Sequence, residues 1–71
     1  MKRFGEKLRA LREHYGISYR QLAAELGYNY SNFARIETGR GMPSVELVVK
    51  IAEYFEVSFD ELMNDKIDLK L

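Results

Sequence analysis

The sequence contains no cysteine, no tryptophan, one proline and one histidine. Without cysteine no disulfide can staple the fold, and one histidine cannot supply the usual four-ligand zinc site. No stretch approaches the roughly 20 apolar residues that cross a bilayer, and no signal-peptide-like apolar segment follows Lys2 and Arg3. These absences predict a soluble, cytoplasmic protein with no metal, no cofactor and no membrane association.

The chain also lacks a net charge, because its eleven basic and eleven acidic residues sum to zero. The charges nevertheless segregate. Residues 1–40 carry eight basic and four acidic side chains, whereas residues 41–71 carry three basic and seven acidic ones, and every arginine lies in the first 40 positions. Because arginine suits phosphate better than lysine does, this split indicates a basic surface on the first part of the chain. The alternative is that solvated surface charges happen to segregate.

What the chain does have is 46% hydrophobic residues in 71 positions, enough for one helical core. Apolar residues recur at three- and four-residue spacing, and Ser, Asn and Gly stand where helix caps belong. Ser18 with Gln21, and Ser58 with Glu61, fit the capping-box pattern. The pattern predicts a helix from Phe4 to Tyr15, a second after Ser18 up to Gly27, a third after Asn29 up to Gly39, a fourth after Ser44 whose inward stripe is Val45, Val48, Ala52 and Phe55, and a short fifth after Ser58 ending at Leu62 or Met63.

Nothing in residues 1–64 alternates like a strand, so these residues are expected to form one all-α domain. Residues 65–71 are expected to be a short C-terminal tail. Residues 66–71 alternate polar and apolar, which is typical of a half-buried strand. Such a strand has no partner in a helical domain, so the tail would either pair with its twin in a dimer or fray.

Residues 18–39 carry the most specific spacing in the chain. Ala23 is followed by Gly27, Phe33 and Ile36 in the order Ala-x3-Gly-x5-Phe-x2-Ile. Two steeply crossing helices need a small residue where the backbones approach, a glycine where the chain reverses, and apolar anchors on the second helix. The spacing therefore predicts a helix-turn-helix, whose second helix projects its N-terminal end outward.

The sequence here resembles the Cro/repressor (XRE) class of helix-turn-helix DNA-binding domains. The resemblance covers about residues 4–63 and rests on Leu11-Arg12, Ile17-Ser18, Leu22-Ala23-x2-Leu26-Gly27, Ile36-Glu37-Thr38-Gly39-Arg40, Pro43-Ser44, Lys50-Ile51-Ala52 and Val57-Ser58-Phe59-Asp60-Glu61-Leu62. It implies a compact five-helix, lambda-repressor-like domain. It also implies a transcriptional regulator, expected to be a repressor, whose partner is double-stranded DNA.

The resemblance further implies that residues 30–37 form the recognition helix in the major groove. The residues implied to contact bases are Asn29, Tyr30, Ser31 and Arg35, and those implied to contact phosphates are Tyr19, Arg20, Thr38 and Arg40. Arg35 suits guanine, since its fork can pair with O6 and N7. The exposed amides around Gly39 and Gly41 are expected to join Arg40 in a phosphate clamp. For Tyr30 the alternative is packing at the domain edge. Tyr19 and Thr38 depart from the family, which commonly has glutamine and asparagine there.

Arg12 and Glu37 are implied by the same resemblance to form a buried ion pair between the first helix and the recognition helix. Both positions fall where apolar periodicity would bury them, and a buried charge requires a partner. The alternative is two unrelated surface charges.

Two other functional classes compete with DNA binding. An enzyme is disfavoured, because Ser18, Ser44 and Ser58 stand at helix caps and no motif links His14 to any of them. A protein-interaction module is the stronger rival. The apolar residues Leu47, Ile51 and Tyr54, together with Ile67, Leu69 and Leu71, predict an exposed patch that forms a homodimer or, alternatively, binds a toxin or another protein.

Overall fold

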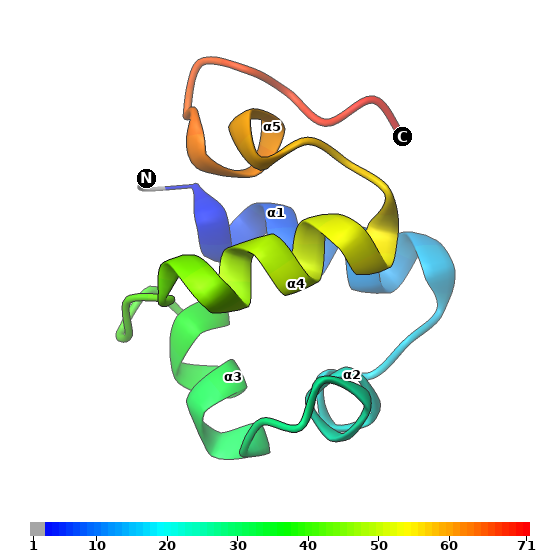
Figure 1. Ribbon diagram of the computed structural model, residues 1–71, viewed down its shortest axis with the longest axis vertical. Helices are drawn as coiled ribbons and strands as arrows, with labels where there is room; N and C mark the ends of the chain where they lie inside the picture. Colours follow the sequence, from blue (N-terminus) through cyan, green and yellow to red (C-terminus); the bar gives the residue numbers. More distant parts are fainter. Residues whose placement is uncertain (1–2) are drawn as a thin grey trace.

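The computed structural model describes residues 3–71, and this part of the chain forms five helices. They are α1 (Phe4–Tyr15), α2 (Tyr19–Leu26), α3 (Tyr30–Glu37), α4 (Val45–Phe55) and α5 (Phe59–Met63). No strand occurs within this range, so the all-α prediction is confirmed. Lys2, counted above among the basic residues, lies outside the described residues. Figure 1 shows α4 lying across α1, with α2 and α3 on one side and α5 with the C-terminal segment on the other.

The predicted caps fix where the helices begin. The Ser44 hydroxyl accepts from the Leu47 N–H at 3.1 Å, and Ser58 and Glu61 form a complete capping box. The box predicted at Ser18 is only half formed. Its hydroxyl accepts from the Gln21 N–H at 3.1 Å, but the described part of the chain shows no returning bond from the Gln21 side chain. The Ser58 N–H that donates to Glu61 lowers the pKa of that carboxyl. This contribution to stability is therefore present above the unfolded-state pKa and is lost as the pH falls through the folded one.

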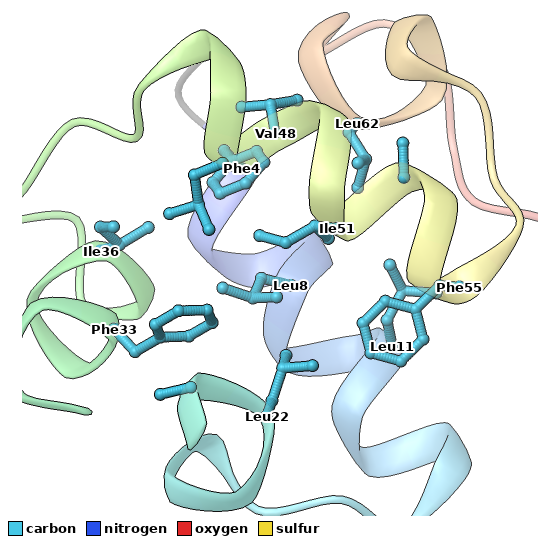
Figure 2. Packing of buried hydrophobic residues seen from close by; sticks show 13 residues of the cluster. Phe4, Leu8, Leu11, Leu22, Phe33, Ile36, Val48, Ile51, Phe55 and Leu62 are labelled. Atoms are coloured by element: carbon cyan, nitrogen blue, oxygen red, sulfur yellow. The ribbon is translucent and has the colours of Figure 1, made fainter. Parts of the chain in front are cut away.

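The core lies where the five helices meet, and every helix contributes to it (Figure 2). Its fully or nearly buried members are Phe4, Leu8, Leu11, Leu22, Ala23, Phe33, Ile36, Leu47, Val48, Ile51, Ala52, Phe55 and Leu62. Such a core places α1 in contact with α2, α3 and α5. The orientation of α3 is therefore set by α1 and α2 together.

The prediction of which face of α4 points into the core is partly wrong. Val45, expected to face inward, is 68% exposed, whereas Leu47 and Ile51, expected in an exposed patch, are 2% and 0% exposed. Apolar residues cover most of the circumference of α4, so periodicity alone admits two inward faces. Packing selects the one that contains Leu47 and Ile51. Tyr54 remains at the surface, and its hydroxyl donates to the Glu25 carboxylate at 2.6 Å, which raises the pKa of Tyr54.

The C-terminal segment 64–71 is neither a strand nor detached from the domain. The Lys7 ammonium donates to the carbonyl oxygens of Glu61, Asn64 and Ile67 at 2.5, 2.8 and 2.5 Å. Leu69 packs against the core, and Ile67 is half-buried. The alternating pattern therefore reflects packing on the body of the same chain. Because Ile67 and Leu69 are partly covered, they offer little exposed apolar surface to the dimer patch predicted from the sequence.

Arg3 holds the same segment at its start. Its backbone N–H donates to the Asp65 carboxylate at 2.9 Å and its guanidinium to the Asp65 carbonyl at 2.8 Å. The guanidinium also lies 2.9 Å from Asp68 in an ion pair. The beginning of α1 and the end of the chain thus form one structural unit.

Gly5 lies where the first turn of α1 meets the last turn of α3. A Cβ atom there would sit 2.6 Å from the carbonyl oxygens of both Ile36 and Glu37. These are backbone atoms, so no rotamer change relieves the clash. We expect Gly5→Ala to lower the free energy of unfolding by about 1–3 kcal/mol, although alanine is ordinarily the better helix former. Urea denaturation measures the change.

Gly41→Ala is the matched control for this substitution. A Cβ atom at Gly41 would meet the Arg35 and Ile36 side chains at an ordinary 3.5 Å. Its unfolding midpoint should stay close to that of the unmodified protein. Equal midpoints for the two alanine variants would show that the close approach at Gly5 has no energetic consequence.

Candidate nucleic-acid interface

The connection between α2 and α3 is built by the residues that the spacing singled out. Gly27 ends α2 in the left-handed conformation with φ 75°, which glycine adopts without a steric penalty. The N–H of Tyr28 then donates to the Ala23 carbonyl at 2.8 Å. Ala23 is 1% exposed, and Phe33 and Ile36 are 0% and 7% exposed. With these residues turned inward, the opposite face of α3 projects into solvent.

The projecting face of α3 carries polar and basic side chains. Ser31, Asn32 and Arg35 are exposed, Ala34 is half-buried, and Tyr30 is 47% exposed. Asn32 was not among the predicted contacts, although it stands outside the buried Phe33 and Ile36 positions on the helical wheel. Its amide makes no hydrogen bond within residues 3–71. A free carboxamide can both donate to and accept from a base edge.

Asn29 and Thr38 use their side chains within the protein. The Asn29 side-chain oxygen accepts from the Ser31 N–H at 2.8 Å as the cap of α3. The Thr38 hydroxyl lies 3.0 Å from the Ala34 carbonyl and 3.1 Å from that of Arg35. Its single proton therefore goes to the end of α3. In the free protein, Thr38 and the side-chain oxygen of Asn29 are thus engaged within the domain, and Asn29 keeps its amide protons for an outside partner.

The loop after α3 differs from the expected amide clamp. The N–H groups of Gly39, Arg40 and Gly41 all donate to carbonyl oxygens of α3, at 3.1, 2.8 and 3.1 Å. The prediction that amides around Gly39 and Gly41 are free for phosphate is therefore wrong, because they complete the C-terminal end of α3. The Arg40 side chain itself is exposed.

At the beginning of α2, two aromatic rings and two guanidinium groups lie in a row. The Arg20 guanidinium carbon is 4.6 Å from the centroid of the Tyr30 ring. The Tyr30 and Tyr19 ring centroids are 6.3 Å apart, and the Arg12 guanidinium lies 5.8 Å from the Tyr19 ring. The row links the first turn of α2 to the first turn of α3.

Arg12 and Glu37 join α1 to the end of α3. The Arg12 Nη2 atom lies 2.7 Å from Glu37 Oε1, and Nε lies 3.0 and 3.1 Å from the two carboxylate oxygens. The remaining Nη1 donates to the Ile17 carbonyl at 2.9 Å. The two side chains are 12% and 7% exposed. The alternative of two unrelated surface charges is thereby excluded.

Two carboxylates of α2 and α3 have partners within the described part of the chain, whereas the exposed arginines Arg35 and Arg40 have none there. Glu37 pairs with Arg12, and Glu25 accepts from the Tyr54 hydroxyl. Arg35 and Arg40 are exposed and have no ion-pair partner among residues 3–71. An anion approaching this face meets uncompensated positive charge.

The match to known families agrees with this geometry. Residues 3–64 match the family described as helix-turn-helix domain. The chain belongs to that family. The resemblance to Cro/repressor-type helix-turn-helix domains is thereby confirmed. Across residues 3–71 of this helix-turn-helix domain, no three His, Cys, Asp or Glu side chains gather as metal ligands, and no helix has the length and apolarity to cross a membrane.

The helix-turn-helix domain is similar to several transcriptional regulators. It is 41% identical over 64 residues to the HTH-type transcriptional repressor RghR of Bacillus subtilis, covering 89% of this chain and 47% of that protein. It is 42% identical over 52 residues to a putative HTH-type transcriptional regulatory protein of Pyrococcus furiosus, covering 73% and 16%. It is 37% identical over 57 residues to the cryptic phage CTXphi transcriptional repressor RstR of Vibrio cholerae, covering 80% and 51%.

The chain thus spans about half the length of RghR and RstR and less of the Pyrococcus protein. No solved structure matches it significantly.

Proposed function

We propose that this helix-turn-helix domain binds double-stranded DNA in a sequence-specific manner and represses transcription by occupying promoter DNA. The exposed face of α3 carries the proposal, since Ser31, Asn32 and Arg35 project from a helix that Phe33 and Ile36 anchor from behind. A helix held this way fits the major groove. The names of the relatives RghR and RstR support repression. Such a role is not catalytic and implies a cytoplasmic location.

DNA upstream of the gene for this protein is the natural first target. Titration against that duplex, with random duplex as competitor, should give a specific complex. Its affinity should fall steeply with salt, because each neutralised phosphate releases counterions. Equal affinity for both duplexes at every salt concentration would refute sequence-specific binding.

Arg35 and Arg40 should have separable effects on binding. Arg35 projects from the last turn of α3, and Arg40 follows the end of that helix. Arg35→Ala should lose about 1–3 kcal/mol of discrimination at one base pair, whereas Arg40→Ala should weaken all sequences alike and reduce the salt slope by about 1. Competition assays with single-base operator variants measure both effects. Lys66→Ala, at an exposed position beyond α5, serves as the control. Equal loss of discrimination in the two arginine variants would contradict the assignment of a base contact to Arg35 and a phosphate contact to Arg40.

We propose that the domain forms a homodimer through the outer side of α4, which replaces the predicted patch of Leu47 and Ile51. Val45 is 68% exposed, and Val49, one turn after it on α4, is 38% exposed. Neighbouring exposed apolar side chains of this kind mark interaction surfaces. A two-fold dimer would present two copies of α3 to half-sites one DNA turn apart.

Val45→Asp should shift the domain from dimer to monomer, because a carboxylate in an apolar interface would be desolvated without a partner. Size-exclusion chromatography with light scattering measures the mass. Leu71→Asp, which changes an apolar side chain that is 56% exposed in the C-terminal segment, should leave the mass unchanged. If the unmodified protein stays monomeric at high concentration, the dimer is ruled out.

A further inference from the structure

Tyr30 and Arg20 form a contact that neither the family match nor the sequence pattern assigns a role. Arg20 is in the first turn of α2 and Tyr30 begins α3. The guanidinium carbon lies 4.6 Å from the ring centroid, within the distance at which a cation is attracted to a ring face. Both side chains are at the surface, so the contact is not part of the core.

Its place over the Tyr30 ring restricts where the Arg20 guanidinium can point without using its hydrogen-bond donors. Arginine is planar and weakly hydrated, so it gives up little water when its face is covered. Its N–H groups lie in the plane of the guanidinium and stay available at the edge. An unsupported exposed arginine would instead sample many rotamers and lose that freedom on binding.

The Tyr30 ring is itself held in place. The Tyr19 ring lies 6.3 Å from it, centroid to centroid, at a 40° tilt. Tyr19 packs against the core and lies under the Arg12 guanidinium that pairs with Glu37. The platform for Arg20 is therefore connected to the buried ion pair between α1 and α3.

We propose that Tyr30 is a positioning residue that holds the Arg20 guanidinium beside the first turn of α3, and that Arg20, rather than the Tyr30 hydroxyl, contacts DNA. The inference rests on the proposed DNA binding. It changes the role expected for Tyr30 from a base contact to a platform. The Tyr30 hydroxyl makes no hydrogen bond within residues 3–71, so removing it costs the free protein nothing.

A double-mutant cycle on DNA affinity tests the proposal. Tyr30→Phe keeps the ring and should bind like the unmodified protein. Tyr30→Leu should lose about two- to fivefold in affinity, because the freed Arg20 side chain must then be ordered on binding. In an Arg20→Ala background, Tyr30→Leu should cause no further loss, because the group it positions is gone. The matched cycle with Arg40→Ala should be additive.

A second measurement follows the stack in the free protein. In NMR spectra, the side-chain protons of Arg20 should be shifted by the ring current in the unmodified protein and in Tyr30→Phe, and should lose that shift in Tyr30→Leu. Thermal unfolding midpoints should fall by no more than a few degrees, because the two side chains are exposed. This readout does not depend on DNA.

Three outcomes would overturn the proposal. Additive losses in the Arg20–Tyr30 cycle would show that the residues act separately. A loss in Tyr30→Phe equal to that in Tyr30→Leu would assign the DNA contact to the hydroxyl. Failure of the unmodified protein to bind any specific duplex would contradict both the proposed function and this inference. This outcome differs from the first two because binding is then absent before any residue is substituted.

Discussion

Arg12→Ala and Glu37→Ala are each expected to lower the free energy of unfolding by about 3–5 kcal/mol, because each leaves a largely buried charge without its partner. The guanidinium makes contacts of 2.7–3.1 Å with Glu37 and donates to the Ile17 carbonyl. A domain of this length has a total stability of about 4–11 kcal/mol at typical values per residue. Chemical denaturation should therefore show a strongly reduced midpoint or no folded population.

Two further variants keep that prediction testable. Arg9→Ala removes an exposed ion pair with Glu13 at 3.4 Å and should change stability by no more than about 0.5 kcal/mol. The double variant Arg12→Met with Glu37→Leu replaces the pair by apolar groups and should recover much of the loss. Single variants at Arg12 and Glu37 that unfold like Arg9→Ala would show that the pair contributes little.

Lys7→Met is expected to lower the free energy of unfolding by about 3 kcal/mol, since hydrogen bonds to a charged group contribute about 1.5–3 kcal/mol each and are not additive. All three protons of the ammonium are used, on the carbonyl oxygens of Glu61, Asn64 and Ile67. Lys7 is 3% exposed, so its loss leaves the Glu61 and Ile67 carbonyl groups without this donor, whereas the Asn64 carbonyl still accepts from the Ile67 N–H at 3.1 Å. Hydrogen exchange of the amides after α5 should rise together with the fall in the denaturation midpoint.

Lys66→Met provides the comparison for Lys7. Lys66 is exposed and belongs to the same C-terminal segment. Its substitution should stay within about 0.5 kcal/mol of the unmodified protein. If the two methionine variants share one midpoint and one exchange pattern, the Lys7 contacts do not hold the segment.

The helices were predictable because their signals are local. Ser44, Ser58 and Asn29 mark helix starts through bonds to amides two or three residues ahead, and Gly27 marks a reversal. The inward face of α4 was not predictable, because Val45, Leu47 and Val49 make the helix apolar on several sides. Packing in the common core determines that Leu47 is buried and Val45 is not.

For the candidate site, the sequence predicted the exposed ridge but not what surrounds it. The Arg20–Tyr30 stack joins two helices through their side chains, which no spacing rule encodes. The burial of Lys7 has a signal in the sequence, since Lys7 stands three residues after Phe4 on the face that buries Leu8 and Leu11. A lone lysine on an apolar stripe indicates a buried ammonium, which requires hydrogen-bond acceptors such as carbonyl oxygens.

The division of α3 into an anchored face and a projecting face has a consequence for how such a domain changes over time. Phe33, Ile36 and Glu37 attach the helix to the rest of the protein, whereas Ser31, Asn32 and Arg35 contribute almost nothing to holding it there. Residues at the projecting positions can therefore be replaced freely while the melting temperature stays nearly constant. One scaffold can in this way acquire a new target without passing through an unstable ancestor.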